Sequence, residues 1–135
     1  MVQMDGLLKM FEKDALAKLI GIEIIDIQPG YAKTSLIVNP DLVNSLGMTH
    51  GATVFAMVDM ALAAASNAQG KVAIALSVTI NFMKATYTGD RLVATATEET
   101  LTNRTGVYRI VVETEKGEKV AVATGTAYRT GASHE

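Results

Sequence analysis

The stretch "GATVFAMVDMALAAASNAQ", residues 51–69, decides how this chain folds. It is rich in alanine and methionine and contains no proline, so it favours a helix. At a rise of 1.5 Å per residue, such a helix is about 27 Å long. Its side chains are apolar nearly all round, which predicts burial on several sides rather than along one stripe. We therefore expect this segment to be the central helix of the fold.

The segments on either side predict one further helix and six strands. Apolar residues recur at spacings of three and four from Met4 to Ile20, which indicates an amphipathic helix, and Gly21 is expected to end it. Pro29-Gly30 favours a tight turn between the first two strands. Residues 71–84 alternate strictly, with large apolar side chains from Val72 to Phe82 on one face. The strands are expected at 22–28, 31–39, 71–84, 91–100, 107–114 and 119–128, and the last four are expected to form an antiparallel meander.

This order of elements predicts an α+β fold with one domain over residues 1–135. A sheet of about six strands twists, and it can curl around one long central helix so that the helix is covered on most sides. The expected architecture is therefore a six-stranded antiparallel sheet wrapped around residues 51–69, with an N-terminal helix added. Exposed strand edges invite pairing with another copy, which predicts a homodimer or a dimer of dimers.

Composition excludes several classes of protein. Hydrophobic residues make up 49% of the chain and charged residues 19%, which is ordinary globular usage. The formal net charge is −2 and no long run of like charges is present, so we expect no nucleic-acid partner. No apolar stretch reaches the roughly 18 to 20 residues that a membrane helix needs, and charges interrupt the first twenty residues, so neither a membrane span nor a signal peptide is expected. A soluble cytoplasmic protein is expected.

Asp59 is the only formally charged residue between His50 and Lys71. An ionised carboxylate without a partner costs several kcal/mol to bury, so Asp59 must be paired, lie at a wet cleft, or titrate with a raised pKa. Each of these environments is typical of a functional site. The structural alternative is that Asp59 caps a neighbouring loop or pairs with a basic residue across a subunit interface.

His50-Gly51 lies where a loop becomes the long helix. The first N–H groups of a helix have no partner within it, and its dipole favours negative charge there. The Gly51 N–H could hold a substrate carbonyl, because no Cβ obstructs the approach. The alternative is an ordinary helix N-terminus with His50 bonded to a loop. Asn44 could likewise hold water or a carboxylate, or simply form a turn.

Other kinds of site lack their residues. The chain has no cysteine and two histidines, one of them His134 in the C-terminal tail, so a zinc site is not expected. The motifs GxSxG, GxGxxG and GxxxxGK[ST] are absent from the sequence.

The stretch "NSLGMTHGATVFAMVD", residues 44–59, resembles the N-x-x-G-x-x-H-G-G-x-x-x-x-x-x-D signature of hotdog-fold acyl-CoA thioesterases. Within that superfamily it is similar to the phenylacetate-pathway thioesterase-like branch, which includes the human acyl-CoA thioesterase thirteen type. The resemblance continues through residues 77–96 and 103–128 and covers roughly residues 17–129. It implies the hotdog fold and an acyl-CoA substrate.

Carried over by position, the resemblance implies a role for each signature residue. Asp59 would be the catalytic carboxylate, acting as general base or as nucleophile, and the Gly51 N–H would polarise the thioester carbonyl. His50 would support that oxyanion site, and Asn44 would orient water or substrate. Asp59 of one subunit would face Gly51 and Asn44 of the other, so the implied assembly is a homodimer with shared active sites, and further a homotetramer. CoA is part of the substrate, and no cofactor is implied.

The chain departs from the signature at two places. Ala52 replaces the second glycine, and Lys84-Ala85 replaces an Arg-Pro found in many relatives. Lys84 could still reach a CoA phosphate, as a point charge without bidentate geometry.

Further substrate contacts are expected along the later strands. Ser77 or Thr79 could face Asp59, and Phe82 lies on the same strand. Arg104 and Thr105 could contact the nucleotide part of CoA or belong to a solvated loop.

The predicted function is hydrolysis of a small aromatic or medium-chain acyl-CoA to the free acid and CoA. The alternative is a non-catalytic hotdog protein that binds acyl-CoA or an aromatic acid. A hydratase on the same fold ranks last, because that group places its aspartate before its histidine, whereas here His50 precedes Asp59.

Overall fold

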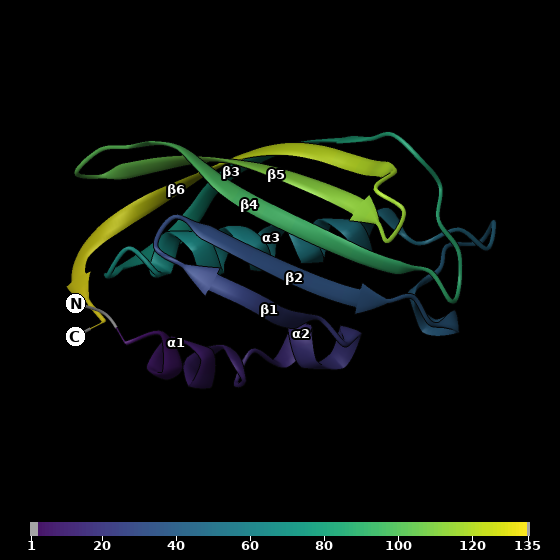
Figure 1. Ribbon diagram of the computed structural model, residues 1–135, viewed down its shortest axis with the longest axis horizontal. Coiled ribbons are helices and arrows are strands. Elements are labelled where there is room, and N and C mark those ends of the chain that lie inside the picture. The colour runs from purple at the N-terminus through teal and green to yellow at the C-terminus, as the bar shows by residue number, and fades with distance from the viewer. Residues whose placement is uncertain (1–2, 135) are drawn as a thin grey trace.

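A curved antiparallel sheet surrounds one long helix in the computed structural model, which describes residues 3–134 (Figure 1). The sheet has six strands, as the sequence predicted, and α3 is the central helix. Within residues 3–134, no helix is long and apolar enough to cross a membrane. The elements are α1 (Met4–Phe11), α2 (Ala15–Ile20), β1 (Glu23–Gln28), β2 (Tyr31–Ile37), the 3-10 helix η1 (Pro40–Leu42), α3 (Gly51–Asn67), β3 (Lys71–Phe82), β4 (Arg91–Leu101), β5 (Thr105–Thr114) and β6 (Lys119–Ser133).

The order of strands differs from the predicted meander. The sheet runs β1-β2-β4-β5-β6-β3, so β3 lies at an edge beside β6, and β4 pairs with β2. Of the four strands after α3, β4, β5 and β6 form consecutive hairpins, whereas β3 pairs with β6 and not with β4, its neighbour in sequence. The reason is the connection after β3, residues 83–90, which is longer than the two to five residues of a common hairpin loop and crosses the end of the sheet instead.

The strict alternation predicted for β3 is broken by a shift of register. Pairing with β6 slips between Ala75 and Ser77, which reverses the faces of the strand on the two sides of the slip. Val78 and Ile80 pack against the core, whereas Ile74, before the slip, is 56% exposed. The prediction that the large apolar residues of this strand share one face is therefore wrong.

The predicted N-terminal helix is two helices. The break falls at Asp14, whose side chain accepts a hydrogen bond of 3.0 Å from the Ala17 N–H and caps the start of α2. Gly21 ends α2 in the left-handed conformation, with φ of 94°, as expected for a helix stop. Both helices lie along the β1 edge of the molecule (Figure 1).

The core lies between α3 and the concave face of the sheet. Met57, Val58 and Leu62 of α3 are essentially inaccessible to solvent, and the helix contacts β2, β3, β4, β5 and β6. One stripe of the helix is uncovered, so the helix is covered on most sides, as expected, and not all round. This open stripe of α3 consists of Ala52, Phe55, Ala56, Asp59 and Ala63, which are exposed or half-buried.

The C-terminal end of α3 is held by the buried amide of Asn67. Its Oδ1 accepts from the Ala73 N–H at 3.0 Å, and its Nδ2 donates to the carbonyl oxygens of Ala63 and Ala73. The same Oδ1 lies 2.7 Å from Nε2 of His134, whose pKa is lowered by burial. Asn67 thus joins the helix to β3 and to the C-terminal tail.

We expect Asn67→Ala to lower the free energy of unfolding by about 2 kcal/mol, because the Ala73 N–H is left buried without an acceptor. Urea denaturation followed by circular dichroism measures this loss. Asn103→Ala is the control, since the Asn103 amide accepts a hydrogen bond from Lys71 at the exposed surface and holds no buried group. Equal losses in the two variants would contradict the role of Asn67.

Candidate active site

The loop before α3 is shaped by the side chain of Asn44. Its Oδ1 accepts hydrogen bonds from the N–H groups of Leu46 at 2.9 Å and Met48 at 3.1 Å. The backbone of Asn44 also donates to the Met48 carbonyl at 2.7 Å. Asn44 therefore forms the turn that one reading of the sequence predicted, and its oxygen is used within the loop. Its role toward water or substrate stays a prediction.

His50 is the N-cap of α3. Its Nδ1 accepts a hydrogen bond of 3.0 Å from the Ala52 N–H, and its carbonyl accepts from the N–H groups of Thr53 and Val54. Because Nδ1 is an acceptor, the proton of the neutral imidazole lies on Nε2. His50 thus satisfies the donors that follow Gly51 and fixes the first turn of the helix.

The Gly51 N–H is the open donor of this helix end. Among residues 3–134, it makes no hydrogen bond. Phe82 from the end of β3 packs beside it, since a Cβ added to Gly51 would lie 3.4 Å from Cζ of the phenyl ring. A helix N-terminus with a free N–H attracts negative charge, so this position can stabilise an oxyanion.

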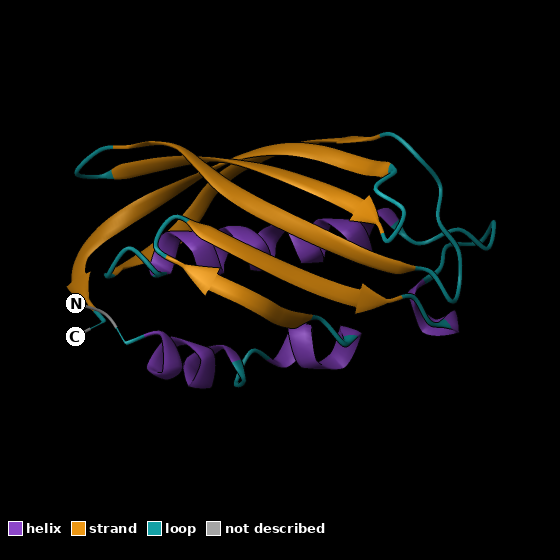
Figure 2. Cartoon of the chain, viewed as in Figure 1, coloured by secondary structure: helices purple, strands orange, loops and turns teal. Residues whose placement is uncertain are grey.

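A cavity of about 310 Å³ adjoins this open donor. Asn44, Gly51, Phe82 and Lys84, four of the residues singled out from the sequence, all line it. The loops that build the cavity gather at the end of the molecule where α3 begins (Figure 2).

Two threonines hold these loops together through hydrogen bonds, and sequence reasoning missed them. Thr86 Oγ1 lies 2.7 Å from Thr49 Oγ1, and the Thr49 N–H donates to the Thr86 carbonyl at 2.8 Å. Both side chains are buried. The two residues lie far apart in the sequence, so nothing local indicated the pair.

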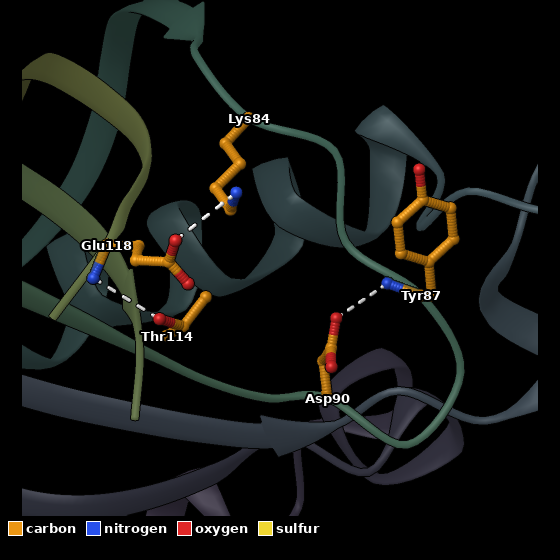
Figure 3. Close-up of polar contacts among 5 residues, drawn as sticks. All are labelled: Lys84, Tyr87, Asp90, Thr114 and Glu118. Atoms are coloured by element: carbon orange, nitrogen blue, oxygen red, sulfur yellow. Dashed lines mark hydrogen bonds and ion pairs between the residues drawn. The ribbon is translucent and has the colours of Figure 1, made fainter. Parts of the chain in front are cut away.

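Lys84 lies between the cavity and a neighbouring polar groove of about 330 Å³. Its Nζ is 3.3 Å from a carboxylate oxygen of Glu118, and both side chains are half exposed (Figure 3). Glu118 is held in turn by its own N–H, which donates to Thr114 Oγ1 at 3.2 Å. An exposed ion pair of this kind is worth little in water, so Lys84 can exchange Glu118 for an anionic ligand at small cost.

Asp59 lies on the open stripe of α3, where it is exposed in the single chain. Partial burial raises the pKa of its carboxyl group, and the negative charge of Asp14 raises it further. Asp59 follows Gly51 by eight residues on the same helix, a rise of about 12 Å. Within one chain, the Gly51 N–H and the Asp59 carboxylate are therefore too far apart to act on the same thioester group.

The contribution of Asp14 was missed from the sequence. It lies in the break between two helices that the pattern predicted as one. An aspartate placed three residues before the Ala17 N–H is an N-cap signal that could have revealed the break.

The remaining predicted contacts lie away from the cavity. Ser77 and Thr79 are exposed on the edge strand β3. Arg104 and Thr105 lie at the turn between β4 and β5, where Arg104 Nη1 donates to the Tyr128 hydroxyl at 3.4 Å. This turn is at the opposite end of the sheet from Lys84, about 30 Å along β5. Within one chain, these four residues therefore do not line the cavity beside Gly51.

The side chains that could bind a metal ion are dispersed over the molecule. Across residues 3–134, no three or more histidine, aspartate or glutamate side chains gather as a metal site would require.

Comparisons with known proteins agree with this geometry. A family model described as the thioesterase superfamily matches residues 46–121. Acyl-coenzyme A thioesterase PaaI of Escherichia coli K12 is 37% identical over 122 residues, which are 90% of this chain and 87% of that protein. The solved structure of E. coli PaaI, from the phenylacetic acid degradation operon, has a TM-score of 0.92 at 35% identity and covers 96% of this chain and 94% of its own.

Two further solved structures are similar to this chain. The TT0310 protein of Thermus thermophilus has a TM-score of 0.84 at 36% identity, covering 87% of this chain and 99% of its own. A hypothetical thioesterase of Streptococcus pneumoniae TIGR4, solved with coenzyme A, has a TM-score of 0.86 at 25% identity, covering 93% of this chain and 98% of its own.

A curved antiparallel sheet wrapped around one long central helix is the architecture of the hotdog fold. The chain belongs to the thioesterase superfamily, in its phenylacetate-pathway thioesterase-like branch, and is a thioester hydrolase. The family resemblance read from residues 44–59 is therefore confirmed.

The raised pKa of Asp59 predicts how its replacement affects stability. Folding favours the protonated carboxyl group, so ionising Asp59 destabilises the fold as the pH rises above the ordinary aspartate pKa of 3.8. Below that value both states are protonated and the cost disappears. We expect Asp59→Asn to raise the melting temperature at pH 7 relative to the native chain, with a smaller gain at pH 4.

Thermal unfolding at a series of pH values measures this difference. Asp14→Asn keeps a capping side chain on α2 while removing the charge that acts on Asp59, so it should recover part of the same gain. A gain independent of pH would contradict the ionisation of Asp59 as its cause.

Proposed function

We propose that this protein hydrolyses acyl-CoA thioesters whose acyl group is small and aromatic or of medium chain length. The observation that carries the proposal is the Gly51 N–H, which has no acceptor in the described chain and adjoins the cavity that continues to Lys84. The thioesterase relatives named above, one solved with coenzyme A, support the same substrate class.

In the proposed mechanism the Gly51 N–H binds the thioester oxygen. That oxygen gains negative charge as the tetrahedral intermediate forms, and a preorganised donor at a helix N-terminus stabilises it. His50 contributes by capping the following N–H and thereby holding the first turn in place. Asn44 fixes the loop that closes this side of the cavity.

Asp59 acts as general base on water or as nucleophile in this proposal. A carboxylate with a raised pKa is a better base near neutral pH than one with an ordinary pKa. Because Gly51 and Asp59 lie about 12 Å apart along one rigid helix, the Asp59 that serves a given Gly51 comes from a second copy. The open stripe of α3 and the edge strand β3 are surfaces that such a homodimer would cover, and two dimers would form a homotetramer.

The CoA portion is proposed to lie in the groove beside Lys84, with its phosphates competing with Glu118 for the ammonium group. Phe82 lines the inner part of this route. Ser77, Thr79, Arg104 and Thr105 can contribute only as residues of a second copy. No cofactor is needed, since CoA is part of the substrate.

Gly51→Pro tests the oxyanion donor while preserving the helix. Proline lacks the N–H but is favoured at the first helical position, and His50 already has the extended backbone, φ −62° and ψ 137°, that a residue before proline requires. We expect kcat to fall by about 10²- to 10³-fold, measured as release of CoA thiol with a thiol reagent.

Gly51→Ala is the matched control, because it keeps the N–H and adds a Cβ only in van der Waals contact with Phe82. Equal rates in the proline and alanine variants would exclude the Gly51 N–H from the mechanism. If the native protein binds acyl-CoA by calorimetry but releases no thiol, the binding function replaces the catalytic one for these substrates.

Mixing two inactive variants tests whether the site is shared. Asp59→Asn is expected to lose about 10²- to 10⁴-fold in kcat. After the two variants are unfolded and refolded together, random dimers of Asp59→Asn and Gly51→Pro chains should recover about a quarter of the native activity, since half the dimers contain one intact site. No recovery would show that Asp59 and Gly51 do not combine across chains.

A further inference from the structure

The hydroxyl groups of Thr49 and Thr86 carry more hydrogen-bond donors than the chain uses. Each hydroxyl has one proton, and Thr86 Oγ1 donates its proton to Thr49 Oγ1 at 2.7 Å. The proton of the Thr49 hydroxyl is left over, and among residues 3–134 it makes no hydrogen bond. Thr49 is only 8% exposed. A buried donor without an acceptor is costly, so this hydroxyl is suited to a ligand that supplies one.

The backbone before α3 places Thr49 on the same cavity as the open amide. His50 has an extended backbone, so the residues on its two sides face one way and His50 faces the other. Thr49 and Gly51 accordingly line the cavity beside Phe82, whereas His50 lines a different depression. The unused hydroxyl proton and the unused Gly51 N–H therefore belong to residues of one cavity.

The spacing of these two donors matches a feature of CoA thioesters. Two extended residues span at most about 7 Å. In an acyl-CoA, a sulfur, two methylenes and a nitrogen separate the thioester carbon from the first amide carbon of the pantetheine arm, a span of about 6 Å. With the thioester oxygen at the Gly51 N–H and the CoA directed toward Lys84, the oxygen of that amide comes within reach of the Thr49 hydroxyl.

We propose that the Thr49 hydroxyl donates a hydrogen bond to the first amide oxygen of the pantetheine arm, and that Thr86 orients it for this contact. Because the Thr86 hydroxyl already donates to the Thr49 oxygen, the Thr49 proton points away from Thr86. Thr49 is thus a specificity-determining residue for thioesters whose thiol portion carries an amide, and Thr86 is a positioning residue. The proposal rests on the proposed function and deepens it.

The test compares kcat/KM for three hexanoyl thioesters, measured as thiol release. They are hexanoyl-CoA, the N-acetylcysteamine thioester, which keeps only the first amide, and the S-pentyl thioester, in which methylenes replace that amide. One net hydrogen bond changes such a rate by about fivefold. Thr49→Val keeps the shape of threonine without the hydroxyl, so it should lower the native preference for the N-acetylcysteamine over the S-pentyl thioester by about fivefold.

Three further variants accompany Thr49→Val. Thr49→Ser keeps the hydroxyl and should keep the native preference, whereas Thr86→Val should lower it in part, since the Thr49 hydroxyl is then free to rotate. Thr34→Val is the matched control. The Thr34 hydroxyl is completely buried outside the cavity and donates to the Met57 carbonyl at 3.3 Å, so its loss should leave the preference unchanged.

An equal loss in Thr49→Val on all three thioesters would show that Thr49 only holds the loop, and it would overturn the proposal while leaving the proposed function intact. A native preference that persists in Thr49→Val would overturn it as well. Absence of thiol release from hexanoyl-CoA by the native protein would instead remove the proposed function, and the role of Thr49 with it.

Discussion

The close packing of α3 against the concave face of the sheet is the constraint on which the rest of the structure depends. Ala61, Ala64 and Ala65 are completely buried, and a Cβ added to Gly125 of β6 would lie 2.8 Å from the Leu62 side chain. Small residues on both surfaces thus allow the helix and the sheet to approach closely, and a close-packed interface leaves no room for the helix to slide. The start of α3 is consequently fixed beside the end of β3, where Phe82 packs beside Gly51.

The same rigid helix separates the two groups that the proposed chemistry must combine. Gly51 and Asp59 lie two turns apart, and no loop between them can bring one to the other. Each is nevertheless accessible, the first through its free N–H and the second on the open stripe of α3. A single chain therefore presents two halves of a site rather than one site, which is why the proposed function requires a second copy.

Much of the fold could be predicted from the sequence because it follows from local patterns. The long helix, the six strands, the Gly21 stop and the turn at Asn44 all rest on residues close together in the chain. The order of the strands and the slip in β3 could not be predicted, since both depend on pairing with β6. The sequence also left open which of the environments considered for Asp59 it occupies, for a related reason. Apolar neighbours in sequence indicate burial, but Ala52, Ala56 and Ala63 are apolar residues that one chain leaves uncovered.

The uncovered alanines of α3 relate the proposed dimer contact to the pKa of Asp59. In the single chain, partial burial and the charge of Asp14 already raise the pKa of Asp59. A second copy packed on the open stripe of α3 would remove more water from the carboxylate, and loss of water raises the pKa of an acid further. The small side chains of Ala56 and Ala63, on either side of Asp59 along the stripe, permit such an approach without closing off the carboxylate. In the proposed dimer, the contact that brings Asp59 to its partner's Gly51 also makes it a stronger base.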